Sequence, residues 1–174
     1  AVYNANAAPY TAAAGGTGNN ISLTNAAGVT FTSSNDAITF GTSNILLGNG
    51  SDLVVNSTGG DISVVAITGT SVEDVTLNAA AGNVTVGVIG AADGQISDVV
   101  LTGTTINLGG NITTDDDADA GDVDINGNVV LTAAVAIDTT DAAAGNVDGT
   151  LDISGTVNGA FDLDITTGNA VVGI

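Results

Sequence analysis

The chain has 174 residues, of which 19 are acidic and none is Lys, Arg, His or Cys, so its formal net charge is −19. Without basic side chains it cannot neutralise phosphates, and neither nucleic acid nor membrane insertion is expected. Catalytic pairs that need His, Cys or a lysine amine cannot form, which leaves only carboxylate pairs, so we expect no enzyme. The hydrophobic content of 44% argues against disorder.

Residues 1–20 follow neither the strand period nor the helix period. They mix Ala, Asn and Gly with two tyrosines and the single proline, which predicts a flexible leader or a cap. The alternative is a strand lent to a neighbouring subunit of a fibre, with Val2, Tyr3 and Tyr10 as its anchors. The two alternatives differ in whether this segment takes part in assembly.

Residues 21–174 alternate short apolar segments with turns and are expected to form one domain. Most segments place an apolar residue at every second position, which is the pattern of a half-buried strand. Gly, Asn, Asp and Ser separate the segments and mark tight corners, as at Asn49-Gly50. The predicted strands are 21–24, 29–32, 37–40, 45–47, 53–55, 61–68, 75–78, 83–89, 96–102, 105–108, 112–113, 122–125, 129–132, 135–138, 151–153, 161–165 and 170–174.

Internal similarity points to a repeat architecture, because residues 67–88 and 153–174 align without a gap at a shift of 86 residues. The strands are short and aromatic residues make up only 3% of the chain. Both features favour a parallel β-solenoid, in which small branched side chains stack in coils of about 20 residues. The alternative is an antiparallel β-sandwich, which needs longer strands and aromatic anchors. We assign Phe31, Phe40 and Phe161 to the core.

The densest acidic run begins at Asp115. Asp115, Asp117 and Asp119 alternate along it, and Asp122 follows after a glycine. Calcium takes six to eight oxygen ligands, and loops of this kind supply them. The run therefore predicts a calcium site, with a solvated acidic loop as the alternative reading. Residues 138–141 form a second, weaker candidate.

The C-terminal segment is an apolar strand without any charge. Its expected assembly residues are Ala170, Val171, Val172 and Ile174. An uncharged strand edge pairs readily with another strand. We therefore expect a junction here, either with a second copy in a homopolymer or with the continuation of a longer chain.

The stretch from residue 129 to residue 174 resembles the repeats of very large bacterial surface proteins of the filamentous-haemagglutinin type. Those proteins are secreted adhesins and matrix proteins, and their shafts are right-handed parallel β-helices, so the resemblance implies this fold. This chain departs from them in being short and in lacking Lys and Arg. The phrases that carry the resemblance are Ile137-Asp138-Thr139-Thr140, Ile153-Ser154-Gly155-Thr156-Val157 and Leu163-Asp164-Ile165 followed by Gly168-Asn169.

The expected function is structural and extracellular, as the subunit of a cell-surface fibre or self-assembling filament, or as a shaft segment of an adhesin in a biofilm matrix. No apolar run approaches the roughly 20 residues that a membrane helix needs. Trypsin-like proteases find no cleavage site in the chain, because it has no Lys or Arg. The alternative function is calcium-dependent recognition of a carbohydrate or of ice. Its candidate residues are the pairs Thr30 with Thr32, Thr68 with Thr70 and Thr102 with Thr104.

Overall fold

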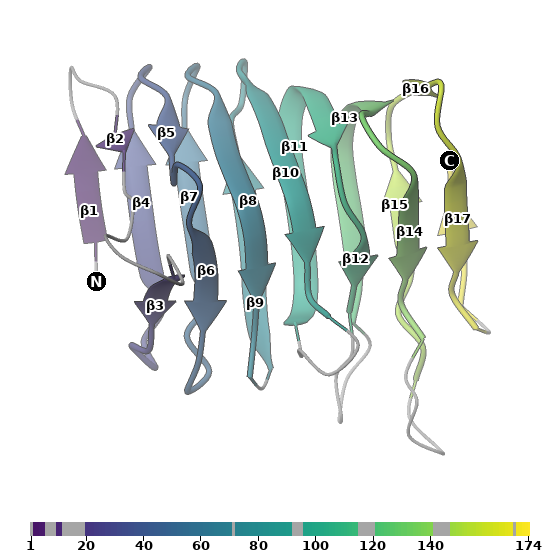
Figure 1. The fold of residues 1–174 in the computed structure, drawn as a ribbon, viewed down its shortest axis with the longest axis horizontal. Coiled ribbons are helices and arrows are strands. Elements are labelled where there is room, and N and C mark those ends of the chain that lie inside the picture. Colours follow the sequence, from purple (N-terminus) through teal and green to yellow (C-terminus); the bar gives the residue numbers. More distant parts are fainter. Residues whose placement is uncertain are drawn as a thin grey trace.

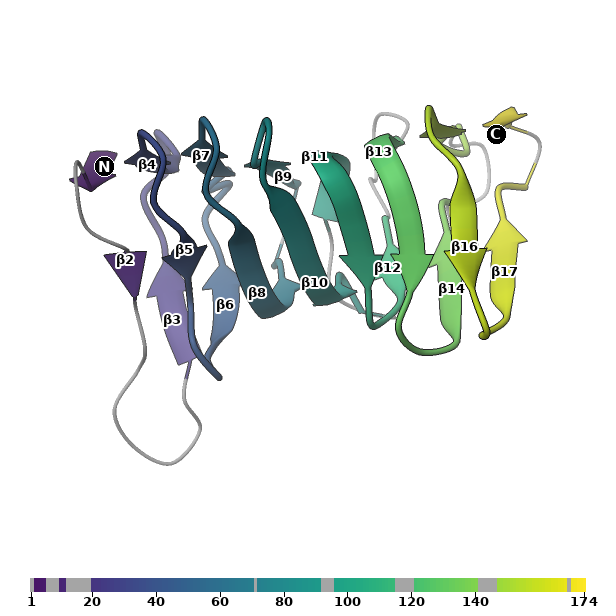
Figure 2. The same cartoon turned by 90° about the horizontal axis from the view of Figure 1, so that it is seen from above.

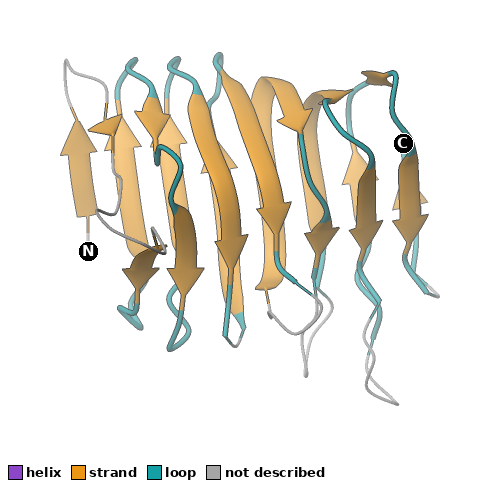
Figure 3. Cartoon of the chain, viewed as in Figure 1, coloured by secondary structure: helices purple, strands orange, loops and turns teal. Residues whose placement is uncertain are grey.

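The computed structural model describes residues 2–5, 10–11, 20–70, 72–91, 96–114, 121–140, 147–168 and 170–174. Within these ranges the chain forms strands and turns and no helix (Figure 3). Every strand pairing among them is parallel. The predicted β-solenoid is therefore confirmed, and the antiparallel sandwich is excluded.

Eighteen strands are present in the described part of the chain. Most are short, and four longer ones (β8, β10, β11 and β13) bend around a corner, so that each pairs within two faces. The strands are β1 (Val2–Ala5), β2 (Tyr10–Thr11), β3 (Asn20–Leu23), β4 (Val29–Ser33), β5 (Ile38–Thr39), β6 (Asn44–Leu47), β7 (Leu53–Ser57), β8 (Ile62–Thr68), β9 (Glu73–Asn78), β10 (Asn83–Ile89), β11 (Ile96–Leu108), β12 (Ile112–Thr113), β13 (Val123–Leu131), β14 (Val135–Asp138), β15 (Leu151–Ile153), β16 (Val157–Gly159), β17 (Leu163–Thr166) and β18 (Val172–Gly173).

The pairings divide the stack into three faces, which we call A, B and C. Face A runs through β1, β4, β7, β9, the first parts of β11 and β13, β15 and β18. Face B runs through β2, β5, the first parts of β8 and β10, the second parts of β11 and β13, and β16. Face C runs through β3, β6, the second parts of β8 and β10, β12, β14 and β17.

The coils wind in a right-handed sense along the long axis. In Figure 1 the chain rises along face A at the back and descends along faces B and C at the front, while it advances from the N-terminus on the left to the C-terminus on the right. Right-handed crossovers are the rule for parallel strands. The view from above in Figure 2 shows the same stack, with the first and last coils at opposite ends.

The core consists of inward side chains that stack on their counterparts in the next coil. The clearest column lies on face C, where isoleucine recurs in every coil. Its inner members are almost fully buried, because each one has a neighbour above and below it. Full burial of such a side chain stabilises the fold by about 1.5–3 kcal/mol. The isoleucine column consists of Ile21, Ile45, Ile67, Ile89, Ile112, Ile137 and Ile165.

Two of the three phenylalanines occupy the core as predicted. Phe31 and Phe40 are buried, and their rings meet edge to face with centroids 5.1 Å apart. Tyr3 belongs to the first coil, and its ring stacks on the ring of Phe31 in the second coil, with the centroids 4.9 Å apart. The core assignment of Phe161 is wrong, because this residue lies at the corner between β16 and β17 and is 50% exposed.

The similarity at a shift of 86 residues does not reflect the stacking. Ile67 pairs with Ile45 and Ile89 on face C, whereas its counterpart Ile153 pairs with Ile125 on face A. Stacked positions in the middle of the chain recur at separations of 22 to 28 residues. The alignment therefore detected the recurring order of strand and turn, and it missed the register.

The predicted strands agree closely with the structure in the middle of the chain. The ranges 83–89, 135–138 and 151–153 match their strands residue for residue. Two pairs of predicted segments are each one continuous strand, β11 and β13, because the chain turns these corners without leaving the extended conformation. The short strand β16 was not predicted, since its sequence Val-Asn-Gly has a single apolar residue.

The stack begins ahead of residue 21, the boundary expected from the sequence. Strand β1 pairs with β4, and strand β2 pairs with β5, so both belong to the first coil of this chain.

Glycine and asparagine make the corners where the sequence placed them. Asn49 and Gly50 adopt the left-handed conformation with φ of 60° and 64°. Position 87 requires glycine because of the adjacent coil: a Cβ atom there would overlap the carbonyl oxygen of Val65. The coils therefore pack closely enough that some positions accept no side chain.

Candidate functional site

The outward side of face A carries two regular rows of polar residues. Alternate residues of a strand point to opposite sides, so each coil contributes outward residues at fixed positions. One outward row, which we call the aspartate column, consists of Asp52, Asp74, Asp98 and Asp122. A second row, which we call the amide column, consists of Thr32, Asn56, Asn78, Thr102 and Asn126.

The aspartate column links successive coils through side-chain hydrogen bonds. The Oδ1 atom of Asp52 accepts the backbone N–H of Asp74 at 3.1 Å, and Asp74 accepts that of Asp98 at 3.2 Å. Asp98 accepts the N–H of Asp122 at 3.0 Å. Asp122 then accepts both the N–H and the hydroxyl of Thr150, at 2.7 and 2.8 Å. Each carboxylate therefore joins its own coil to the next one.

The same arrangement brings like charges together. Neighbouring strands lie about 4.8 Å apart, and like charges directly opposite each other on a sheet are destabilising. The chain has no basic side chain that could compensate for this repulsion. The aspartate column thus combines favourable hydrogen bonds with a repulsion that dissolved salt reduces.

Glu73 is the only glutamate of the chain, and it is 0% exposed. Its carboxylate accepts the N–H of Gly50 at 3.2 Å and the N–H and hydroxyl of Thr70 at 3.0 and 3.3 Å. These donors offset part of the cost of burying the group. Glu73 therefore joins the corner that precedes β9 to the corner that precedes β7. The spacing of Thr70 and Glu73 is that of a capping box, which is the signal from which this contact could have been predicted.

A buried hydroxyl lies close to this corner. Ser51 precedes Asp52, as Glu73 precedes Asp74 in the next coil, and the register of β7 and β9 places the two residues in stacked positions. Ser51 is fully buried, and its Oγ atom has no hydrogen-bond partner among the residues that the structure describes. The corner between faces C and A is thus more polar inside than the remainder of the core.

Of the predicted calcium ligands, the structure describes one. Asp115, Asp117 and Asp119 lie outside the described residues, while Asp122 contributes to the aspartate column. Within the described ranges, no group of three or more acidic side chains is arranged to hold a metal ion. The calcium site stays a prediction.

The weaker candidate at residues 138–141 is described in part. Asp138 accepts the N–H and the hydroxyl of Thr140, at 3.1 and 2.7 Å, and Asp141 lies outside the described residues. The Asp138 carboxylate therefore caps its own turn.

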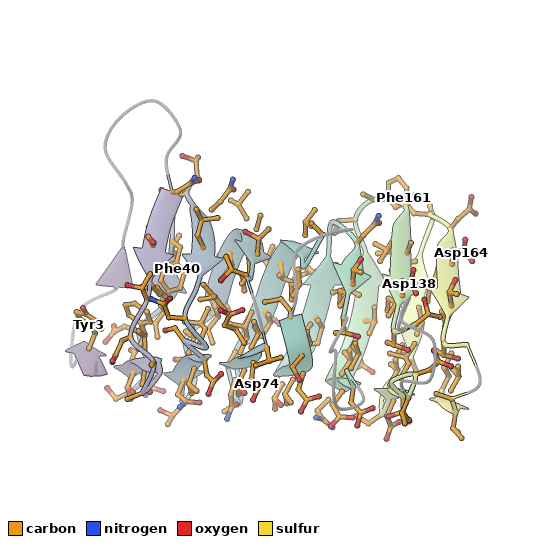
Figure 4. The ribbon with its side chains drawn as sticks, turned by 90° about the horizontal axis from the view of Figure 1, so that it is seen from below. Tyr3, Phe40, Asp74, Asp138, Phe161 and Asp164 are labelled. Carbon is orange, nitrogen blue, oxygen red and sulfur yellow. The ribbon has the colours of Figure 1, made fainter. Side chains whose placement is uncertain are left out.

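The predicted assembly residues lie at the two ends of the stack. Val2 and Tyr3 belong to β1 and Tyr10 belongs to β2, the outermost strands at the N-terminal end. Tyr3 is 46% exposed although its ring stacks on Phe31. Figure 4 shows Tyr3 at one end of the molecule, with Phe161 and Asp164 at the other.

The C-terminal residues form an apolar surface. Val171 and Ile174 are largely exposed, Val172 is 41% exposed, and Ala170 is half-buried. We call Phe161, Val171, Val172 and Ile174 the end patch. The sequence located three of these four residues, and Phe161 was missed because it was assigned to the core.

The candidate threonine pairs for surface recognition do not share one array. Thr30 and Thr32 lie on β4 of face A, and Thr32 and Thr102 both belong to the amide column of that face, whereas Thr68 ends β8 on face C. Thr104 sits at the next corner, where its hydroxyl donates to the carbonyl oxygen of Ala81 at 2.9 Å.

No family model matches this chain, and neither a curated protein nor a solved structure matches it. None of the described residues belongs to a helix long and apolar enough to span a bilayer.

Proposed function

We propose that the chain is a structural rod module of an extracellular fibre or of an adhesin shaft. The observation that carries this proposal is the unbroken stacking of coils along one axis in the described part of the chain, with a buried column on every face. A solenoid of this kind is extended by adding coils, since each coil contacts only its neighbours.

The direction of the hydrogen bonds supports a load-bearing role. Backbone bonds between coils, such as Val29 N–H to the Asp52 carbonyl at 2.8 Å and Val99 N–H to the Asp122 carbonyl at 2.9 Å, run along the long axis. The carboxylates of the aspartate column add further bonds in the same direction. Tension along the axis is therefore shared among the three faces of each coil.

Composition supports a location outside the cell. The absence of Lys and Arg removes all sites for trypsin-like proteases, which benefits a long-lived external protein. The net charge of −19 also keeps rods soluble and apart along their sides.

A second candidate function is recognition of a neutral polysaccharide by face A, with calcium at the acidic run. The amide column favours it, because it presents Asn and Thr side chains at the regular spacing of the coils. A glycan-binding assay with and without calcium tests this candidate, which is abandoned if no glycan is retained in either condition.

The experiment for the main proposal determines the shape of the purified protein and its location in the producing cells. Electron microscopy of the purified chain is expected to show thin straight rods, and immunogold labelling of the producing cells is expected to place gold outside the envelope. Compact globules, or gold confined to the cell interior, would overturn the proposal.

A further inference from the structure

We propose that Asn49 carries a sugar, attached through its side-chain amide at the corner between β6 and β7. This modification site rests on the proposed extracellular role, because sugars on asparagine belong to surface loops of secreted proteins. The donor it implies is a sugar that is activated by a phosphate at C1.

The acceptor pattern for this modification is Asn, then any residue except Pro, then Ser or Thr. Five asparagines of the chain begin such a pattern. They are Asn20, Asn49, Asn56, Asn83 and Asn111. In a chain this rich in Asn, Ser and Thr the pattern alone does not distinguish among the five, so the structure has to do so.

Asn49 differs from the other four in its surroundings. It lies on a turn and is exposed, with a φ of 60° that asparagine tolerates better than most residues. Space is open around the next residue, since a Cβ atom added to Gly50 would meet nothing within 4 Å apart from its chain neighbours. The turn projects from the lower edge of the stack in Figure 1, where the chain passes from face C to face A. A bulky hydrated group therefore fits here without displacing a neighbour.

The other four asparagines stand in the stacked rows of the faces. Asn56 and Asn83 are half-buried within β7 and β10. Asn20 pairs with another asparagine in the ladder of β3 and β6. The Oδ1 atom of Asn111 accepts a backbone N–H of a neighbouring coil at 2.9 Å. A sugar on any of these four would lie over the stacked side chains of its row, so the geometry favours Asn49.

The hydroxyl of Ser51 is the second observation. It is 0% exposed, and its Oγ atom has no hydrogen-bond partner among the residues that the structure describes. A buried hydroxyl without a partner destabilises a fold, whereas alanine would occupy the same place without that cost. Ser57 is also buried, but its Oγ atom accepts the N–H of Gly60 at 2.8 Å and donates to the carbonyl oxygen of Asp36 at 3.3 Å. The acceptor pattern requires a hydroxyl two residues after Asn49, which gives Ser51 a role that the folded chain does not.

Burial of this hydroxyl also sets the order of events. The transferring enzyme has to contact Ser51 before the corner closes, so transfer precedes the folding of this coil. In the transfer, the Nδ2 atom of Asn49 forms a bond to C1 of the sugar and releases one amide proton. The bond between C1 and the phosphate oxygen of the donor breaks, and the nucleotide or lipid diphosphate leaves.

The test begins with the chain isolated from the producing cells, with the external and internal fractions kept separate. Trypsin finds no site, but cleavage before aspartate puts each of the five asparagines on a peptide of its own, and Asn49 falls on residues 36–51. We expect mass spectrometry to find added sugar mass on peptide 36–51 and none on the peptides of the other four asparagines. A single hexose indicates a nucleotide donor, and an oligosaccharide of fixed size indicates a lipid-linked one.

Two serine variants connect the sugar to the buried hydroxyl. Ser51→Ala is expected to remove the sugar from peptide 36–51. Its matched control, Ser57→Ala, lies outside the Asn49 pattern and should keep the sugar. In chains made by a host that attaches no sugars, Ser51→Ala should raise the melting temperature, and Ser57→Ala should lower it because two hydrogen bonds are lost.

The failures are distinguishable. A peptide 36–51 without sugar in the external fraction overturns the inference and leaves the structural proposal intact, whereas a chain confined to the cell interior overturns both. A sugar that persists in Ser51→Ala, or a melting temperature that falls in this variant as it does in Ser57→Ala, also overturns the inference.

Discussion

The middle and the end of the isoleucine column differ in burial although their sequences are alike. Ile67 on β8 is covered by Ile45 and Ile89, and it is fully buried. Ile165 on β17 occupies the same position in the last coil, pairs only with Ile137 and is half-buried. Burial in this fold is thus provided by the adjacent coils, and an inward side chain contributes its full stabilisation only when it has neighbours on both sides.

The largest expected effect comes from truncating the two isoleucines. Ile67→Ala removes a fully buried side chain and is expected to lower the free energy of unfolding by about 2–5 kcal/mol. Ile165→Ala is expected to cost only about 1 kcal/mol, since part of that side chain is already in water. Urea denaturation followed by circular dichroism measures both. Equal losses would show that coil neighbours do not determine burial.

The next effect concerns the buried corner. Glu73→Ala leaves the N–H groups of Gly50 and Thr70 without their acceptor and is expected to cost about 1–3 kcal/mol. The adjacent Val72 is half exposed, so Val72→Ala serves as the matched control with a loss of about 0.5 kcal/mol or less. Thermal melting of both variants decides whether the single glutamate holds two coil corners together. A melting temperature for Glu73→Ala equal to that of the control would refute this role.

A smaller effect separates the two contributions of the aspartate column to stability, which are its hydrogen bonds between coils and the repulsion between its charges. Asp98→Asn keeps the Oδ1 acceptor for the N–H of Asp122 and removes one charge from the row, so a gain of about 0.5 kcal/mol is expected at low ionic strength. Salt screens the repulsion between exposed charges, and the gain should fade in 1 M NaCl. Asp98→Ala loses the hydrogen bond as well and is expected to be less stable than Asp98→Asn in both conditions. Urea midpoints at two salt concentrations measure this. A gain that salt leaves unchanged would argue against charge repulsion.

The smallest effect is that of calcium. If the acidic run binds the ion, calcium raises the free energy of unfolding by RT ln(1 + [L]/Kd), which is about 0.4 kcal/mol at a calcium concentration equal to Kd. The melting temperature then rises with calcium and falls again with chelator. A control with the same ionic strength of NaCl separates binding from screening. Replacing Asp115, Asp117 and Asp119 with Asn should abolish the calcium response. Overlapping curves with calcium and chelator would end the prediction.

Much of the fold could be predicted from the alternation of apolar and polar residues in strands and from the residue types at turns. Both signals lie within short stretches of sequence. The strand at residues 83–89 and the corner at Asn49-Gly50 could each be predicted from their own residues. Register is not local. The separations between stacked isoleucines vary along the chain, since the loops between faces differ in length, so a fixed shift of 86 residues joined different faces.

The sites were harder to predict than the strands. The aspartate column was overlooked because its members are separated by whole coils, and the dense run at Asp115 drew attention to residues that are neighbours in sequence. A search for an acidic residue directly before each face A strand finds Asp52 and Asp122, whereas Asp74 and Asp98 lie inside β9 and β11. The burial of Phe161 was predicted wrongly for a different reason. Only the three-dimensional path of the chain shows that this residue lies at an exposed corner.

The most direct test of parallel stacking is a methyl NOE spectrum of the chain labelled at isoleucine Cδ1. The account predicts cross-peaks from Ile67 to Ile45 and to Ile89, and from Ile125 to Ile153, with none between Ile67 and Ile153. Cross-peaks between Ile67 and Ile153, or a pattern that joins consecutive strands as hairpins, would contradict it.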